Sequence, residues 1–405
     1  MPCKTPPPPL GACGKTSSRS QGFPLSTFRF PNLSPPASQR IPGLDGLRAI
    51  SILLVVFGHS RFTAPAPVSE WHTIWTIIGN MQLGVRMFFV ISGFLITTLL
   101  VKEQKKYGTI SLRGFYARRI LRIFPAFYFY IAVVTALSLA GILAASRSDV
   151  LLGATFTWNY GHLFLPSSHG GVEALGQMWT LSMEEQFYIL WPITLIWLGL
   201  QKSLRVAVLI VLALPFVRVI SYFAWPASRE FMAMMLHTGS DPIMFGCIVA
   251  LLTGTPRFEA LVDKMNRSWL PGVAFVFAFF ISPFLKVHLK GVYDCPIGIS
   301  LESLCLTIIL LYATRTPRSA AGMVLNARIP VAIGILSYSL YLWSNLPFVA
   351  LTGLWKSIFP LNILICFLAA AMSYFLIEKP FLSLKKRLSH QGTKTNASTP
   401  EPDAI

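Results

Sequence analysis

Hydrophobic stretches recur along most of the chain and are separated by short polar segments. Each stretch is close to the roughly 20 residues that a membrane-spanning helix needs, although the first is short. The pattern therefore predicts an all-α fold, a polytopic integral membrane helical bundle with about ten transmembrane helices. The predicted spans are residues 47–62, 84–101, 123–143, 179–200, 204–224, 231–254, 270–285, 297–314, 330–351 and 361–380.

The segment 150–165 is also apolar, but it is short and is interrupted by Thr, Asn and Gly. We interpret it as re-entrant or interfacial. With this segment not crossing and the N-terminal tail inside, most loop Lys and Arg residues fall on the inner side of the membrane. If the segment crossed, every later loop would invert and this bias would largely disappear. We therefore predict a multi-pass protein of the cell inner (cytoplasmic) membrane with both termini cytoplasmic.

Three regions follow from this pattern. Residues 1–40 are rich in Pro and Ser and contain no apolar run of signal-peptide length, which indicates a disordered cytoplasmic tail. Residues 41–388 form the transmembrane domain, and residues 389–405 are a second tail that we expect to be disordered. We expect no appended soluble domain.

The composition agrees with a membrane protein. Hydrophobic residues make up 54% and charged residues 12% of the chain, against about 25% charged in soluble domains. The net charge of +18 would suggest nucleic acid if it formed a patch on a soluble domain, but it lies in short loops that set topology. We expect membrane lipid as a partner and no nucleic acid. The six cysteines show no metal-binding spacing, so we expect neither disulfides nor a metal.

Arg48 and His59 are the most informative pair of residues. They lie eleven residues apart in one apolar run, which places both on one helix face about 16 Å apart. An ionisable group at mid-bilayer costs at least about 2.5 kcal/mol, and such groups usually face a cavity or a partner. Histidine is also the side chain best suited to exchange protons near neutral pH. A snorkelling Arg48 and a structural His59 remain the alternative.

A basic cluster, Arg118, Arg119 and Arg122, follows the second predicted span. Arg118 and Arg122 are four residues apart and share a helix face, so they can bind a phosphorylated ligand from the cytoplasmic side. The alternative is simple anchoring of an inner loop by positive charge. We also count Arg86, near the outer end of the second span, among the cofactor-binding candidates.

Adjacent carboxylates, Glu184 and Glu185, lie at the outer end of another predicted span. Adjacent helix residues point about 100° apart, so at most one of them readily enters a shared cavity. We expect Glu184 or Glu185 to act in a site, and a structural pairing with Arg86 or Arg218 remains open. Asp241 is interpreted as a helix N-cap rather than a site acid.

In the second span, Ser92 and Gly93 are small residues that allow close helix approach, and we assign Ser92 no nucleophilic role. No GxSxG elbow, Walker loop, HExxH or GxGxxG motif occurs in a usable context. Soluble hydrolases, nucleotidases and dehydrogenases therefore have little support.

Several sequence motifs resemble those of the membrane acyltransferase 3 family and occur in the same order as in that family, over residues 41 to about 388. Any one motif is weak evidence for the family, but the ordered set of motifs is specific to it. The motifs are Ile41-Pro-Gly-Leu-Asp-Gly-Leu-Arg, Gly58-His-Ser, Gly84-Val-Arg-Met-Phe-Phe-Val-Ile-Ser-Gly, Arg118-Arg-Ile-Leu-Arg-Ile-Phe-Pro, Trp179-Thr-Leu-Ser-Met-Glu-Glu-Gln, Ser337-Tyr-Ser-Leu-Tyr-Leu-Trp and Glu378-Lys-Pro-Phe.

The resemblance implies an enzyme that moves an acyl group, usually acetyl, from cytoplasmic acyl-CoA to a hydroxyl of a sugar, surface polysaccharide or related lipid-linked acceptor. It also implies that His59 and Arg48 carry the activity, and that the basic cluster holds the CoA phosphates or anchors the loop. Many members have a histidine shortly after the Ser337 motif. This chain has Trp343-Ser344-Asn345 there, which leaves proton transfer to His59.

We expect His59 to act as a general base on the acceptor hydroxyl or to carry the acyl group itself. Arg48 would orient the thioester or neutralise the oxyanion, and Glu184 or Glu185 would orient the imidazole. A glycolipid transporter or flippase is a rival, weakened by the lack of internal repeats and paired broken helices. A non-catalytic envelope scaffold or sensor is a second rival, and it would bind acyl-CoA without releasing CoA.

Overall fold

The computed structural model describes residues 40–63, 77–164, 173–349 and 359–384, and the regular elements of these ranges are all helices. The predicted tails lie outside the described residues, apart from Arg40. The α-helices are α1 (Leu44–Ser60), α3 (Met81–Tyr107), α4 (Leu112–Leu139), α5 (Arg147–Ala154), α6 (Trp158–Phe164), α7 (Met178–Ala224), α8 (Leu236–Gly239), α9 (Asp241–Leu252), α10 (Pro256–Asn266), α11 (Leu270–Val276), α12 (Ser282–Leu289), α13 (Gly291–Tyr293), α14 (Ile299–Arg315), α15 (Ala320–Leu325), α16 (Arg328–Trp343), α17 (Leu346–Val349) and α19 (Leu361–Ser373). Short 3-10 helices are η2 (Arg61–Thr63), η4 (Glu173–Leu175) and η5 (Pro226–Phe231), and π-helical turns are η6 (Phe277–Ile281), η7 (Asp294–Gly298) and η8 (Tyr374–Glu378).

Within the described ranges, six helical stretches are long and apolar enough to cross a membrane, and α9 with α10 would make a seventh if this pair, bent by 117°, is one span. The prediction of a helical multi-pass membrane protein is confirmed, whereas the count of about ten is not. The six stretches are Met81–Tyr107, Leu112–Leu139, Met178–Ala224, Leu270–Leu289, Gly291–Arg315 and Leu361–Leu384.

The difference in number arises from where helices begin and end. Two predicted spans, 179–200 and 204–224, lie within the 47 residues of α7. A straight helix of that length would be about 70 Å long, more than twice the roughly 30 Å hydrocarbon core. The backbone breaks at Gly199, whose φ of 70° and ψ of 170° are not helical. The stretches at α1 and α16 form helices of only 17 and 16 residues.

The segment predicted to be re-entrant or interfacial, 150–165, folds as parts of two short helices. α5 has eight residues and α6 has seven. Neither approaches the roughly 20 residues needed for a full crossing.

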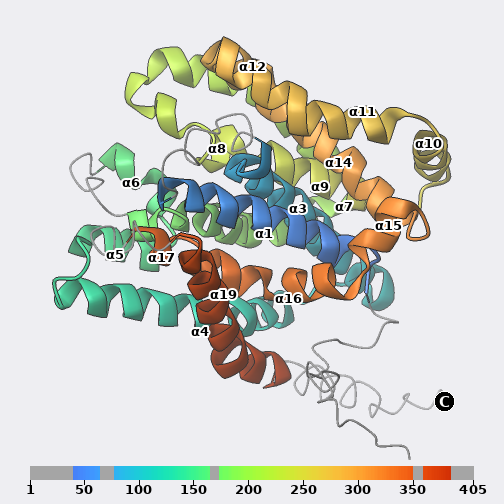
Figure 1. Ribbon diagram of the computed structural model, residues 1–405. Coiled ribbons are helices and arrows are strands. Elements are labelled where there is room, and N and C mark those ends of the chain that lie inside the picture. The colour runs from blue at the N-terminus through green and yellow to red at the C-terminus, as the bar shows by residue number, and fades with distance from the viewer. Residues whose placement is uncertain (1–39, 64–76, 165–172, 350–358, 385–405) are drawn as a thin grey trace, which may run out of the picture.

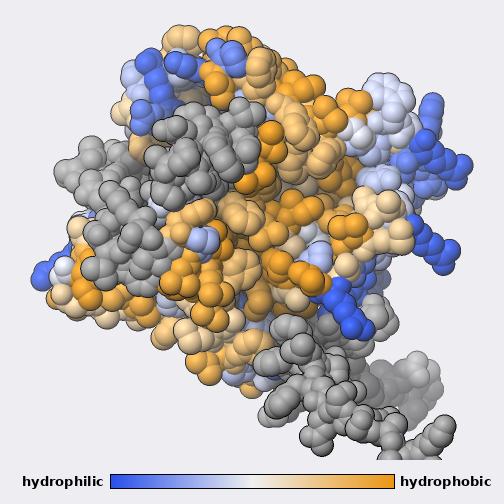
Figure 2. Space-filling view, viewed as in Figure 1, coloured by the Kyte–Doolittle hydropathy of each residue, from blue (hydrophilic) through white to orange (hydrophobic). Residues whose placement is uncertain are grey.

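Helix α1 packs against α3 on one side and α16 on the other. In Figure 1, α1 and α16 lie side by side in the middle of the bundle, with α4 on one flank and α11 and α12 on the opposite flank. The surface carries large exposed apolar side chains such as Trp197 and Phe216. Figure 2 shows hydrophobic residues over the middle of the visible face and hydrophilic residues at its ends, one of them over α10. This distribution fits a bundle surrounded by lipid.

The interface between α3 and α9 depends on glycine. A Cβ atom at Gly93 would lie 2.0 Å from the carbonyl oxygen of Ile243, and one at Gly246 would lie 2.2 Å from that of Val90. These helices therefore touch backbone to backbone, which confirms the prediction that Gly93 allows close approach.

Two buried arginines find partners that the sequence analysis did not assign to them. Arg86 on α3 forms an ion pair and hydrogen bond with Glu302 of α14, which is fully buried. Arg218 on α7 donates to Asp241 at 2.6 Å, and the hydroxyl of Ser300 donates to the other carboxylate oxygen of Asp241 at 2.5 Å. The suggested pairing with Glu184 or Glu185 is therefore not seen for either arginine. Asp241 is the first residue of α9 and makes no capping bond, so the N-cap interpretation was wrong.

Candidate active site

Helices α1, α3, α4, α7 and α16 surround a cavity of about 100 Å³, which we call the inner cavity. It lies at the Arg48 end of α1, the end predicted to face the cytoplasm. Apolar and aromatic side chains make up most of its wall. Its hydroxyl and charged groups are Arg48, Ser92, Arg119, Arg122, Thr180, Glu184, Tyr188, Ser337, Tyr338 and Tyr341.

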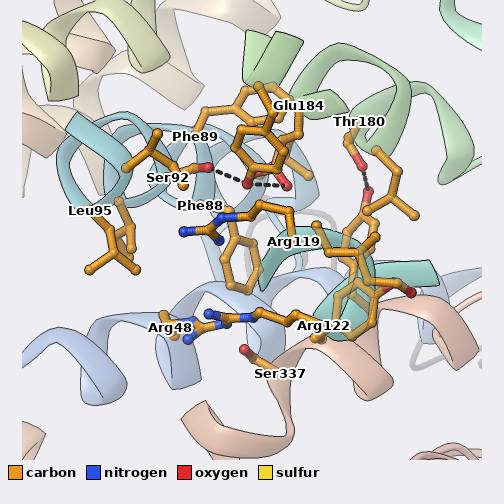
Figure 3. Close-up of a pocket in the computed structure, with 18 residues that line it drawn as sticks. Arg48, Phe88, Phe89, Ser92, Leu95, Arg119, Arg122, Thr180, Glu184 and Ser337 are labelled. Atoms are coloured by element: carbon orange, nitrogen blue, oxygen red, sulfur yellow. Dashed lines mark hydrogen bonds between the residues drawn. The ribbon is translucent and has the colours of Figure 1, made fainter. Parts of the chain in front are cut away.

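Three arginines converge on the inner cavity. Arg48 comes from α1, and Arg119 and Arg122 come from adjacent turns of α4. Figure 3 shows their guanidinium groups directed toward the same part of the cavity. In the described part of the chain, no carboxylate lies within ion-pair distance of any of the three. Arg119 is instead held over the rings of Phe115 and Tyr188, at 5.6 and 5.4 Å from their centroids.

The hydroxyl of Ser337 also lies at this cavity, and the side chain is buried. Its Oγ has no hydrogen-bond partner among the described residues. A buried hydroxyl is normally paired, because leaving it unpaired costs about 1–3 kcal/mol. Three unpaired guanidinium groups and one unpaired hydroxyl are the donors that a phosphate group would bind.

Arg118 is not part of this arrangement. Its side chain is 40% exposed and forms an ion pair with Glu103 of α3 at 2.9 Å. The structure therefore does not bring Arg118 to the cavity that Arg122 lines, because Arg118 is paired with Glu103 near the end of α3. The residues that share the cavity are Arg119 and Arg122, three apart along α4.

Of the two adjacent carboxylates, Glu184 lines the inner cavity and Glu185 does not. The hydroxyl of Tyr188 donates to Glu184 Oε2 at 3.3 Å and lies 2.7 Å from the hydroxyl of Ser92. The expected role of a carboxylate in orienting the imidazole finds no support, because no described hydrogen bond joins Glu184 or Glu185 to His59.

A second cavity of about 320 Å³, the outer cavity, lies at the His59 end of α1. Its polar lining residues are His59, Gln82, Arg86, Gln177, Trp179, Glu230, Tyr341 and Asn345. Val85, Phe89 and Tyr341 line both cavities and separate them. We call these three residues the neck.

The imidazole of His59 lies beside the backbone of Ser344 and borders the outer cavity. Its Nδ1 is buried and has no hydrogen-bond partner among the described residues. In the tautomer that leaves Nδ1 unprotonated, this nitrogen carries a lone pair, as a general base or nucleophile requires.

Arg86 lines the outer cavity, not the inner one where the other arginines meet. Its charge is balanced by Glu302, and Lys286 lies 2.6 Å from the same carboxylate. Asp294 lies 3.7 Å from Arg86 and 3.6 Å from Lys286, which completes a network of two positive and two negative groups. The structure therefore does not bring Arg86 to the site that its assignment to cofactor binding would require.

Several residues of these cavities were not predicted from the sequence, although their spacing carries a signal. Ser337, Tyr341 and Asn345 are spaced by four residues, the spacing of one helix face. They line the inner cavity, the neck and the outer cavity in turn. Glu302 also stood as a lone carboxylate within the apolar stretch 297–314, a pattern that indicates a buried partner.

Comparison with known proteins identifies relatives along most of the chain. Residues 41–378 match a family described as an acyltransferase domain. A peptidoglycan O-acetyltransferase OatA of Listeria monocytogenes is 26% identical over 373 residues, covering 84% of this chain and 55% of the relative. An O-acetyltransferase OatA of Staphylococcus aureus is 28% identical over 88% of this chain and 60% of the relative. A putative peptidoglycan O-acetyltransferase, YrhL of Bacillus subtilis, is 29% identical over 84% and 54%.

The chain thus spans little more than half the length of these relatives. No solved structure matches it.

Proposed function

Because the chain belongs to the acyltransferase 3 family, we propose that it is a membrane O-acyltransferase. It moves an acyl group, usually acetyl, from acyl-CoA to a hydroxyl of a cell-surface glycan or a lipid-linked sugar precursor. The names of the relatives support a glycan acceptor of the peptidoglycan type. The observation that carries the proposal is the pair of cavities, one rich in unpaired arginine and one containing His59, which meet at the neck.

The inner cavity is our proposed donor site. Guanidinium groups bind phosphate oxygens with paired hydrogen bonds, and Arg48, Arg119 and Arg122 have no carboxylate partner to displace among the described residues. At about 100 Å³ the cavity is smaller than the roughly 300 Å³ at which ordinary small-molecule sites begin. It therefore takes only the pyrophosphate and the start of the pantetheine arm, and the adenosine stays on the cytoplasmic side.

The two cavities are separated by a distance that this donor can span. Eleven residues of α1 between Arg48 and His59 correspond to about 16 Å. A pantetheine arm has about twelve backbone bonds between phosphate and sulfur, equivalent to about four extended residues or roughly 14 Å. An anion held at the arginines therefore places its thioester near His59, without movement of the whole CoA.

The chemistry is then acyl transfer at His59. The acceptor oxygen attacks the thioester carbon, the new C–O bond forms and the C–S bond breaks. His59 takes the proton from the hydroxyl and returns it to the departing thiolate, which leaves as free CoA. In the two-step form, an imidazole nitrogen attacks the thioester carbon first, and CoA leaves as the thiolate, which takes the imidazole proton. The acceptor hydroxyl then attacks the acyl-imidazole, the C–N bond breaks and the hydroxyl proton passes to the departing imidazole. Both forms need a ring nitrogen of His59 that carries a lone pair.

The outer cavity is our proposed acceptor site. Its volume of about 320 Å³ can hold a hydroxymethyl group and part of a sugar ring. The carboxamides there are positioned, since Asn345 donates to Gln177 Oε1 at 2.7 Å and Gln177 donates to the Leu342 carbonyl at 2.9 Å. Fixed amides of this kind suit recognition of an uncharged polar acceptor.

The proposal is tested by mass spectrometry of the host's surface glycans and secreted metabolites with and without the gene. We expect loss of a mass step equal to one acyl group, together with acetyl-CoA-dependent release of free CoA by the purified chain. A protein that binds acetyl-CoA but never releases CoA with any glycan acceptor would instead be a sensor or scaffold.

A further inference from the structure

We propose that the neck is a gate between donor and acceptor, and that Tyr341 is the part of it that moves. The inference rests on the proposed function, because it concerns the route by which the thioester arm reaches His59. In the structure the gate is closed. The neck residues Val85, Phe89 and Tyr341 are only 6%, 2% and 8% exposed, although each borders both cavities.

Aromatic packing holds the gate closed from both sides. Phe89 packs edge-on against Trp179 of the outer cavity, with ring centroids 5.9 Å apart. Tyr341 packs edge-on against Phe88 of the inner cavity, with centroids 6.2 Å apart. Edge-to-face pairs of this kind contribute about 0.5–1.5 kcal/mol beyond their burial.

Two hydrogen bonds also hold Tyr341 in place, and we call them the latch. The Thr180 hydroxyl donates to the phenol oxygen of Tyr341 at 2.6 Å, and the phenol in turn hydrogen bonds to the backbone carbonyl of Gln177 at 3.4 Å. Both latch partners lie at the start of α7. The latch therefore joins α16 to α7 across the passage.

Among the neck residues, Tyr341 is the one positioned to move. Val85 is β-branched and stiff at χ1, and Phe89 lies in the middle of the long helix α3. Tyr341 lies two residues before α16 ends at Trp343, and its ring can change rotamer once the latch hydrogen bond is broken. The free energy needed for opening is therefore little more than that of the latch hydrogen bonds and one aromatic contact.

A closed gate is what the charges on either side require. Arg48 and His59 border two cavities that would otherwise form one polar path through the bundle. Continuous water along that path would leak protons and hydrolyse the thioester before an acceptor arrives. The gate confines the exposed thioester to the time when the arm occupies the neck.

The first test measures passage without catalysis. In the full chain in lipid vesicles, Ile96→Cys places a thiol in the inner cavity. A membrane-impermeant thiol reagent is added on the His59 side, and labelling of that cysteine is followed by mass spectrometry. Adding Tyr341→Phe should speed labelling by about tenfold, as expected when closing loses about 1.4 kcal/mol.

The matched control is Tyr338→Phe. It removes a phenol of the same helix that donates to the Ile123 carbonyl at 2.8 Å and does not border the outer cavity. Labelling in this variant should stay at the parent rate. Equal labelling rates in the parent, Tyr341→Phe and Tyr338→Phe would overturn the gate.

The second test blocks the neck. Val85→Phe should retain acetyl-CoA binding, which also reports that the chain is folded, while acyl transfer falls by about a hundredfold because the thioester is held out of place. Val273→Phe, the same change at a 44% exposed position, should transfer normally. Transfer by Val85→Phe at the parent rate would overturn the gate. If the parent itself transfers nothing, the proposed function fails, and the labelling test still decides on the gate.

Discussion

Arg48 and His59 lie on the same helix, yet each borders a different cavity, and the two cavities share only the three neck residues. Binding of negative charge and proton transfer are therefore assigned to different cavities, although the sequence pattern suggested one site for both. Arg48 lies with Arg119 and Arg122, where it can recognise negative charge. His59 borders the outer cavity, and its Nδ1 has no hydrogen-bond partner in the part of the chain that the structure describes, so the imidazole can exchange a proton there. Acyl-CoA, the proposed donor, is long enough to reach from the three arginines to His59.

The first prediction concerns His59. Replacing it by Gln should abolish acyl transfer, because Gln can donate and accept hydrogen bonds but cannot take a proton near pH 7. Release of CoA from acetyl-CoA is the measurement, and acetyl-CoA binding by the same variant is the control for folding. Substantial turnover in a folded His59→Gln protein would exclude both the general-base and the acyl-carrier roles.

The second prediction separates two arginines of one helix. Arg122→Lys should weaken acetyl-CoA binding by about tenfold, since a point charge cannot reproduce the paired hydrogen bonds of guanidinium to phosphate. Arg118→Lys is the matched control, because Arg118 is paired with Glu103 and does not line the cavity. Binding is measured by calorimetry. A larger loss at Arg118 than at Arg122 would return the cluster to the role of a loop anchor.

The helical membrane fold could be predicted because the bilayer leaves few alternatives. Long apolar stretches form helices when no water can satisfy the backbone, so α3 and α14 appear where the pattern placed them. Helix ends were harder to predict. Gly199 turns the chain inside one apolar region, and α9 ends at Leu252 before a sharp bend into α10.

Only the part of the site that lies on a single helix could be predicted from the sequence. Arg48 and His59 share a face of α1, which spacing alone reveals. Which helices contact one another depends on tertiary packing, and the spacing of residues within one helix carries no information about it. Arg86 was therefore grouped with the basic cluster, although it pairs with Glu302, 216 residues away in sequence. Glu184 was likewise expected beside His59, although the fold places it at the inner cavity.

The third prediction concerns membrane topology and rests on the basic loops. Cysteines introduced at Arg257 and Arg318, both exposed, should be protected from an impermeant thiol reagent added outside intact cells. A cysteine at exposed Lys290 should be labelled. Labelling is read by mass spectrometry, with permeabilised cells as the control in which all three react. The opposite pattern would place Arg48 and the inner cavity on the outer side, and with it the proposed donor site.

The last prediction concerns the charged network beside the outer cavity. Glu302→Gln should destabilise the protein by about 3–5 kcal/mol, because it leaves the buried Arg86 and the partly buried Lys286 with one negative charge in place of two. The measurement is thermal unfolding in detergent. Glu259→Gln is the matched control, since its ion pair with Arg315 is about one-third exposed and should contribute only about 0–1 kcal/mol. Equal unfolding temperatures for the two variants would mean that the network is solvated from the outer cavity. Arg86 would then be available to an anionic acceptor and would not be committed to holding α3 against α14.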